Sequence, residues 1–386
     1  MFLQILITIG ASQALTLAML LLTRRKKCAA EDWLAVKLIL IFVLTMLYNY
    51  RYELAAWWPG FPLNPLVMGY LVMPIFYFYI RSAAGYPVKL KHWRLAAHGL
   101  PFFAAFGLLQ YTIAHMSAPL ASLLVPCDPA ACSEPGLQVI YFGFFLVIFP
   151  YYIYRSLRVL QLHEAYILTK FSYTEDINLD WLNRFLWTIT GVWLCFIGFE
   201  VIGNGVFKMM GEMGFQISFL ALLFSLVALG VYGLRRPQAV FAHEATEEPT
   251  AETPSDAKYQ NYRLPDDKAQ QYLRQLEDHM KQERPYLEPK LTIGELAQGA
   301  GLPVNTLSQI LNDRLGQNFF DYVNSYRVAA FQELARSPKG GQYTLLGLAY
   351  EAGFNSKSTF NAIFKRATGQ TPSEYVKSLR VNKALS

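Results

Sequence analysis

Apolar residues run almost without interruption through the first part of the chain, and a mixed polar pattern replaces them after Arg235. A helix needs roughly 20 apolar residues to span a bilayer, and within lipid its backbone groups must bond to one another. Seven apolar stretches meet this length, at 2–22, 34–50, 63–80, 95–114, 137–154, 185–202 and 215–234. The pattern therefore predicts a seven-transmembrane helix bundle over residues 1–236.

Basic residues gather on one side of these predicted spans. With Met1 outside, the inner segments hold 14 Lys and Arg residues and the outer segments only Arg51 and Lys208. Positively charged loops favour the cytoplasmic side of a membrane. We therefore expect a multi-pass membrane protein, with the N-terminus outside and the C-terminal domain in the cytoplasm.

The polar part of the chain divides into a linker, a connecting helix and a domain. Residues 237–257 are acidic and proline-bearing, which is typical of a disordered linker. A helix is predicted within 258–290, because Asp266 suits a helix start and Pro285 a helix end. Its apolar stripe either forms a dimer seam or packs on the remaining domain, 291–386, and consists of Leu273, Leu276 and Met280.

An internal repeat lies within 291–386. The stretch "LTIGELAQGAGLPVNTLSQILNDRLGQNFFDYV" aligns with "YTLLGLAYEAGFNSKSTFNAIFKRATGQTPSEYV" at an offset of 52, which becomes 53 after the first turn. Gly301 and Gly353 fall at equivalent positions, and a glycine there accepts the left-handed backbone that ends a helix. Each copy is therefore predicted to be a helix-turn-helix, in an all-α chain.

The second helix of each copy carries an outer polar stripe at spacing i, i+3, i+4, i+7. The two stripes occupy equivalent positions and consist of Asn305, Ser308, Gln309 and Asn312 in copy one, and of Ser358, Asn361, Ala362 and Lys365 in copy two. Asn and Gln can bond adenine, and Ser or Lys can bond base edges or phosphate. The alternative is a solvated polar face; two equivalent stripes favour an interface with double-stranded DNA.

These features give the last ~100 residues a resemblance to the AraC-type DNA-binding domain. The ending "AYEAGFNSKSTFNAIFKRATGQTPSEY" follows the family signature, and Tyr326–Arg327 match the usual Tyr-Arg of its linker helix, here "FFDYVNSYRVAAFQELARS". The resemblance implies that both recognition helices enter successive major grooves, with Lys357 and Arg366 on phosphates. Many members carry Arg where Gln309 stands, so a guanine contact does not carry over to that position.

Other chemistry is sparse in the sequence. We find no P-loop, GxSxG, HExxH or metal-spaced cluster, so we predict neither an enzyme nor a cofactor or metal site. Cys127 and Cys132 lie in a predicted outer loop, where they either form a short-loop disulfide or remain two unpaired thiols.

With this resemblance, we expect a transcription regulator embedded in the bacterial inner membrane, whose membrane domain senses a signal, a small molecule or an envelope stimulus. Its expected partners are double-stranded DNA, the lipid bilayer, a second copy of the chain and RNA polymerase. Two alternatives stay open: helices that only anchor a domain released by proteolysis, or a transporter with a fused regulator.

Overall fold

The computed structural model describes residues 2–23, 29–49, 65–86, 92–115, 139–140, 143–175, 177–206 and 264–385. Contacts divide the chain into two compact units. The N-terminal unit comprises Met1–Gln161 and Leu179–Glu248, and the C-terminal unit comprises Leu162–Asn178 and Pro249–Ser386. The sequence did not indicate that Leu162–Asn178, which lies between two parts of the N-terminal unit along the chain, belongs to the C-terminal unit.

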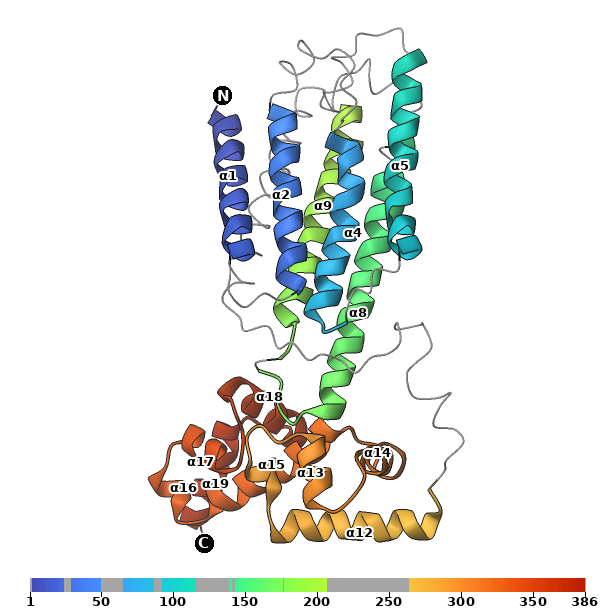
Figure 1. Cartoon of the computed structure of the whole chain (residues 1–386). Coiled ribbons are helices and arrows are strands. Elements are labelled where there is room, and N and C mark those ends of the chain that lie inside the picture. The colour runs from blue at the N-terminus through green and yellow to red at the C-terminus, as the bar shows by residue number, and fades with distance from the viewer. Residues whose placement is uncertain are drawn as a thin grey trace. The chain divides into compact units, whose positions relative to one another are not determined.

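The described part of the N-terminal unit is helical (Figure 1). Its elements are α1 (Phe2–Thr23), α2 (Ala29–Asn49), α4 (Pro65–Ala83), α5 (His92–His115), π-helix η2 (Gly143–Ile148), the first part of α8 (Phe149–Lys170) and α9 (Asp180–Val206). Helices α1, α2, α4 and α5 pack against one another in chain order. Aromatic pairs connect the later helices: Phe76 of α4 lies 5.7 Å from Phe185 of α9, and Phe149 of α8 stacks on Trp193 of α9 at 4.8 Å.

The expected seven-transmembrane bundle is wrong for this structure. Among the residues described, no helix combines the length and the apolar character needed to cross a bilayer. Helix α8 carries Arg155 and Glu164, both beyond the predicted span at 137–154, and α2 buries Lys37 within the predicted span at 34–50. The predicted span at 215–234 lies outside the described residues. The finding likewise contradicts the predicted multi-pass location in the bacterial inner membrane.

From α12 onward the elements of the C-terminal unit are helices, coloured from gold to red in Figure 1. They are α12 (Asp266–Gln282), 3-10 helix η3 (Pro285–Leu287), α13 (Ile293–Gly299), α14 (Val304–Gln309), π-helix η4 (Ile310–Arg314), α15 (Phe319–Arg336), α16 (Lys339–Gln342), α17 (Leu345–Glu351), α18 (Lys357–Thr368) and α19 (Pro372–Leu385). Helix α12 begins at Asp266 and ends before Pro285, as its sequence predicted.

Helix α12 packs on its own unit. The side chains of Leu276 and Met280 are completely buried, in one core with Leu296 and Leu307 of the first repeat copy. Of the two readings left open for the apolar stripe of this helix, packing on the remaining domain is the one that the structure supports.

Helix α15 joins two separate hydrophobic cores, one for each repeat copy. Phe319 and Val323 face the core that contains α13 and α14, whereas Phe331 lies in the core that contains α17 and α18. Asn318 caps the helix, because its side-chain oxygen accepts a hydrogen bond from the amide of Asp321. Because one continuous helix contributes to both cores, it fixes the separation and the relative orientation of the two copies.

Candidate nucleic-acid interface

The two repeat copies share the same turn geometry, which confirms the alignment read from the sequence. Gly301 has φ +67° and Gly353 has φ +91°, so both adopt the left-handed conformation. In each copy, the amide of the residue after this glycine donates to the carbonyl five residues earlier, at 2.8 Å and 3.0 Å. Gly316 and Gly369, 53 positions apart, are also left-handed, with φ +62° and φ +75°. Each copy is therefore a helix-turn-helix.

In copy two, the second helix of the motif is the regular α-helix α18. Phe360, Ile363 and Phe364 are buried on its inner side, where Phe360 and Phe364 pack around Phe331 at centroid distances of 4.7 and 5.2 Å. The opposite side carries the predicted stripe, all of it exposed: Ser358, Asn361, Ala362 and Lys365. This face presents an amide, a hydroxyl and an ammonium group outward from a rigid support.

The equivalent region of copy one is less regular. Helix α14 ends at Gln309 and continues as the π-helix η4. Asn305 and Asn312 are exposed, whereas Ser308 and Gln309 are only partly so. A π-helix turns less per residue than an α-helix, so Asn312 is rotated away from the position that the α-helical spacing gave it. Copy one therefore does not present its four predicted residues as one straight stripe.

The predicted basic residues of copy two differ in their surroundings. Lys357, in the first turn of α18, and Lys365, in its last turn, are exposed. Arg366 is exposed too, but its guanidinium forms an ion pair with Asp321 in the first turn of α15. That pair connects the recognition helix to the linker helix, so Arg366 would have to share or leave Asp321 in order to hold a phosphate.

Arg327 has a role in the structure that its sequence motif did not reveal. Its side chain is 1% exposed, and its guanidinium donates to the carbonyl oxygens of Tyr286 at 2.8 Å, Ser172 at 2.9 Å and Glu288 at 2.7 Å. Burial lowers the pKa of Arg327 to about 10, so the group remains charged at neutral pH. The Arg of the Tyr-Arg pair thus ties the linker helix α15 to two other segments of the unit.

One of those segments, residues 171–175, was missed entirely by the sequence reasoning. Phe171 forms an isolated antiparallel bridge with Thr292, and Ser172 bonds to Leu291 through both its amide and its hydroxyl. The partners lie more than 100 residues away in the chain, so no local pattern signals them. The stretch looked like an ordinary polar connection between two apolar runs.

A carboxylate from this segment lies at the start of α18. Ser356 caps that helix by accepting a hydrogen bond from the amide of Thr359. The Oε2 atom of Glu175 lies 3.5 Å from Nδ2 of Asn355 and accepts from the amide of Thr174 at 3.1 Å. The Oε1 atom is buried and lacks a partner of standard hydrogen-bond geometry in the described part of the chain.

The surroundings of Glu175 favour its ionised form. Burial by itself would raise the pKa of Glu175, but the Thr359 side chain, its own backbone amide, the Ser356 side chain and the Thr174 amide together lower it below 4.5. A negative charge is also favoured there by the N-terminal end of the helix.

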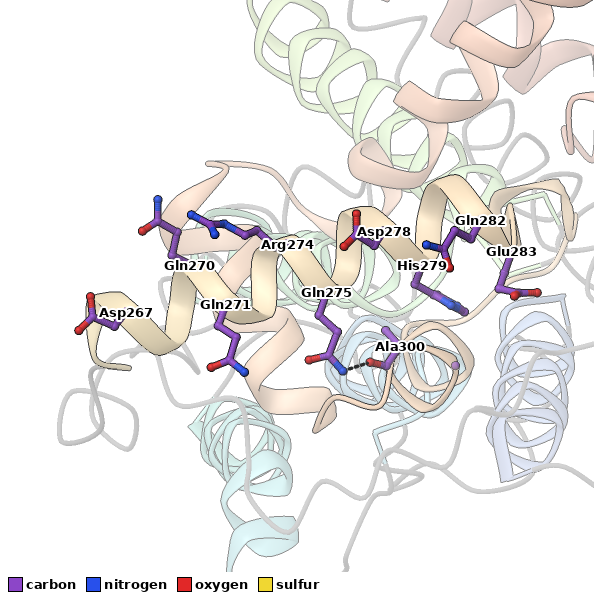
Figure 2. Close-up of a pocket in the computed structure, with 11 residues that line it drawn as sticks. Asp267, Gln270, Gln271, Arg274, Gln275, Asp278, His279, Gln282, Glu283 and Ala300 are labelled. Atoms are coloured by element: carbon purple, nitrogen blue, oxygen red, sulfur yellow. Dashed lines mark hydrogen bonds between the residues drawn. The ribbon is translucent and has the colours of Figure 1, made fainter.

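Figure 2 shows an open groove lined by polar residues of α12 and by Gly299 and Ala300 at the end of α13. Gln275 donates to the carbonyl of Ala300 at 2.8 Å, drawn as a dashed line, and the His279 ring lies so close to Gly299 that a Cβ there would sit 2.7 Å from Nε2. These contacts hold α12 against the first helix-turn-helix. The groove follows the polar side of one helix, so we assign it a structural role.

The predicted disulfide pair, Cys127 and Cys132, lies outside the described residues. Within the described ranges, Cys195 is exposed and unbridged, and no group of three or more His, Cys, Asp or Glu side chains is arranged to hold a metal.

Comparison with known proteins identifies the repeat region. A family described as a helix-turn-helix domain matches residues 296–378. A putative AraC-like transcription regulator of Streptomyces lividans is 30% identical over 86 residues, which are 22% of this chain and 27% of that protein. The HTH-type transcriptional activator RhaS of Mannheimia succiniciproducens is 29% identical over 110 residues, 28% of this chain and 37% of that protein. No solved structure matches.

The matched residues, 296–378, coincide with the region in which the structure shows the two helix-turn-helix motifs. The matches cover about a quarter of this chain and about a third of each relative. The C-terminal unit therefore carries an AraC-type helix-turn-helix domain, as its sequence indicated. The fusion of this domain to a seven-helix membrane bundle has no support from the family or the relatives.

Proposed function

We propose that the protein is a transcription regulator that binds specific sequences of double-stranded DNA through its two helix-turn-helix motifs. The observation that carries the proposal is the duplication. Two motifs with the same left-handed turns are attached to one continuous helix, and each places polar side chains outward on its second helix. A single polar helix would be an ordinary solvated surface; two equivalent ones at a fixed separation suit two successive major grooves.

The residue types on α18 suit base reading. The amide of Asn361 can bond adenine bidentately, and the ammonium of Lys365 can bond guanine or a phosphate. Ser358 adds a hydroxyl that serves either role. In copy one, Asn305 and Asn312 are exposed, and Ser308 and Gln309 are partly exposed on α14.

The net charge of residues 258–386 favours DNA binding, but only of modest affinity. Residues 258–386 contain 17 basic and 12 acidic residues, a formal charge of +5. Lys357 and Lys365 are exposed, whereas Arg366 is paired with Asp321. Few phosphate contacts give modest affinity at physiological salt, so we propose that the protein acts as a dimer or on paired sites. We also propose that a signal acts through the N-terminal unit and that RNA polymerase is its partner at the promoter.

Genome-wide mapping of the DNA bound by the full-length protein would supply target sites for a test. On such a site, Lys365→Ala should weaken binding by about 1–3 kcal/mol in a fluorescence-anisotropy titration. Lys281→Ala is the matched control, because Lys281 is exposed on α12, outside both helix-turn-helix motifs. Equal affinity for wild type and both variants would remove Lys365 from the interface, and absence of any specific site would contradict the function itself.

A further inference from the structure

The 171–175 segment is bound by the DNA-binding domain through a specific set of hydrogen bonds. The carbonyl of Ser172 accepts from Asn324 at 3.2 Å and from Arg327 at 2.9 Å, and its hydroxyl accepts from Arg327 at 3.0 Å and donates to the Leu291 carbonyl at 2.8 Å. Ser172 is 1% exposed, Asn324 and Arg327 likewise. Ser172 is therefore fixed to α15 and to Leu291 by hydrogen bonds from its amide, its hydroxyl and its carbonyl.

The segment touches both copies of the helix-turn-helix. Phe171 and Ser172 pair with Leu291 and Thr292, at the start of the first helix of copy one. Glu175 lies 3.5 Å from Asn355, immediately before α18 of copy two. Leu168, just before the segment, packs against the core of copy two. A change in the position of the segment would therefore alter its contacts with both motifs.

The position of Glu175 coincides with a place suited to a phosphate. The start of a helix presents free amide groups and a partial positive charge, which bind anions. In a helix-turn-helix, the first residues of the recognition helix approach the DNA. In this structure the Glu175 carboxylate lies beside Asn355 and interacts with the side chains of Ser356 and Thr359 at the start of α18. The equivalent helix of copy one begins after Pro303 and has no side-chain cap, so the arrangement belongs to copy two alone.

We propose that the 171–175 segment is an internal partner of the DNA-binding domain, and that the Glu175 carboxylate competes with a DNA phosphate for the start of α18. The proposal rests on the DNA-binding function proposed above. A phosphate and a carboxylate repel one another, so the segment must withdraw Glu175 before α18 seats fully in the groove. Because the segment connects α8 to α9, any event that shifts the end of α8 or the start of α9 changes the affinity for DNA.

The test measures DNA affinity of the full-length protein with and without this carboxylate. On a mapped target site, Glu175→Gln should bind about 5- to 10-fold more tightly than wild type in a fluorescence-anisotropy titration, which is the low end of typical coupling between sites. Glu164→Gln is the control, because Glu164 is an exposed carboxylate on α8, eleven residues earlier in the chain. It should leave the affinity unchanged. Equal affinities for wild type and both variants would overturn the proposal.

A second readout follows the segment itself. The amide of Ser172 is bonded to the Leu291 carbonyl at 3.1 Å and should exchange its hydrogen slowly in the free protein. Addition of target DNA should speed this exchange, because DNA displaces the segment; unchanged protection on saturation with DNA would contradict the proposal. A wild-type protein that binds no DNA sequence specifically is a different result, and it would overturn the proposed function.

Discussion

The buried guanidinium of Arg327 offers a quantitative test of how the C-terminal unit is held together. Three carbonyl oxygens, those of Tyr286, Ser172 and Glu288, accept from it at 2.7–2.9 Å. Arg327→Met keeps a long apolar stem of similar reach but removes every donor. The three carbonyls would then lose their charged partner inside the protein, where a hydrogen bond to a charged group is worth about 1.5–3 kcal/mol and the terms are not additive.

We expect Arg327→Met to lower the free energy of unfolding of the C-terminal unit by about 3–5 kcal/mol, the usual cost of removing one member of a buried charged network. Such a loss is a large part of the stability of a typical domain. Arg336→Met is the matched control, since Arg336 lies on the same helix but is exposed. It should change the free energy by about 0.5 kcal/mol or less.

The assay must report on this unit alone, because a chain with two units need not unfold in one step. All seven Trp residues lie at positions outside the C-terminal unit, so Trp fluorescence does not follow it. Amide hydrogen exchange of α13 and α15 in the full-length protein gives the opening free energy locally. Equal protection in Arg327→Met and Arg336→Met would refute the assignment of Arg327 as the tie between α15, η3 and the 171–175 segment.

Three further predictions concern packing, backbone and pH. Phe331→Ala should lower the unfolding free energy by about 3–5 kcal/mol, since this fully buried ring is packed between two others; exchange in α17 and α18 measures it. Gly353→Ala should destabilise copy two by more than about 1 kcal/mol, because φ is +91° and the new Cβ would sit 2.3 Å from the Tyr286 carbonyl; unaltered thermal unfolding would contradict this. The pKa of Glu175 is lowered in the fold, so its ionised form stabilises the fold above about pH 4.5, and this stabilisation is lost as the pH falls through the folded-state pKa. In an acid titration, the unfolding free energy of Glu175→Gln should lack this pH-dependent contribution.

The C-terminal domain was predictable because its information is local and repeated. Spacing of apolar residues gave α18, the offset of 52 and then 53 gave the two left-handed turns, and Asp266 and Pro285 gave the bounds of α12. Each of these rests on interactions within a few residues, which a sequence displays directly. The exposed side of α18 followed from the same periodicity.

Other parts were not predictable, for physical reasons. The chain forms the π-helix η4 at Ile310–Arg314, with Ile310 and Leu311 buried, so counting at α-helical spacing misplaced Asn312. Contacts of Ser172 and Glu175 join residues more than 100 positions apart, and no local pattern records such pairs. The predicted membrane spans were drawn from apolar composition alone, whereas the described helices also carry charged residues, as α8 does.

The central claim is that two helix-turn-helix motifs on one linker helix read two DNA elements. Selection of bound sequences from a random double-stranded DNA library by the full-length protein tests it most directly. We expect the selected DNA to share two sequence elements about 10 base pairs apart, which is one turn of the double helix. Asn361→Ala should relax the sequence preference in only one of these elements. A selection that enriches no sequence, or a single element that Asn361→Ala leaves unchanged, would contradict the account.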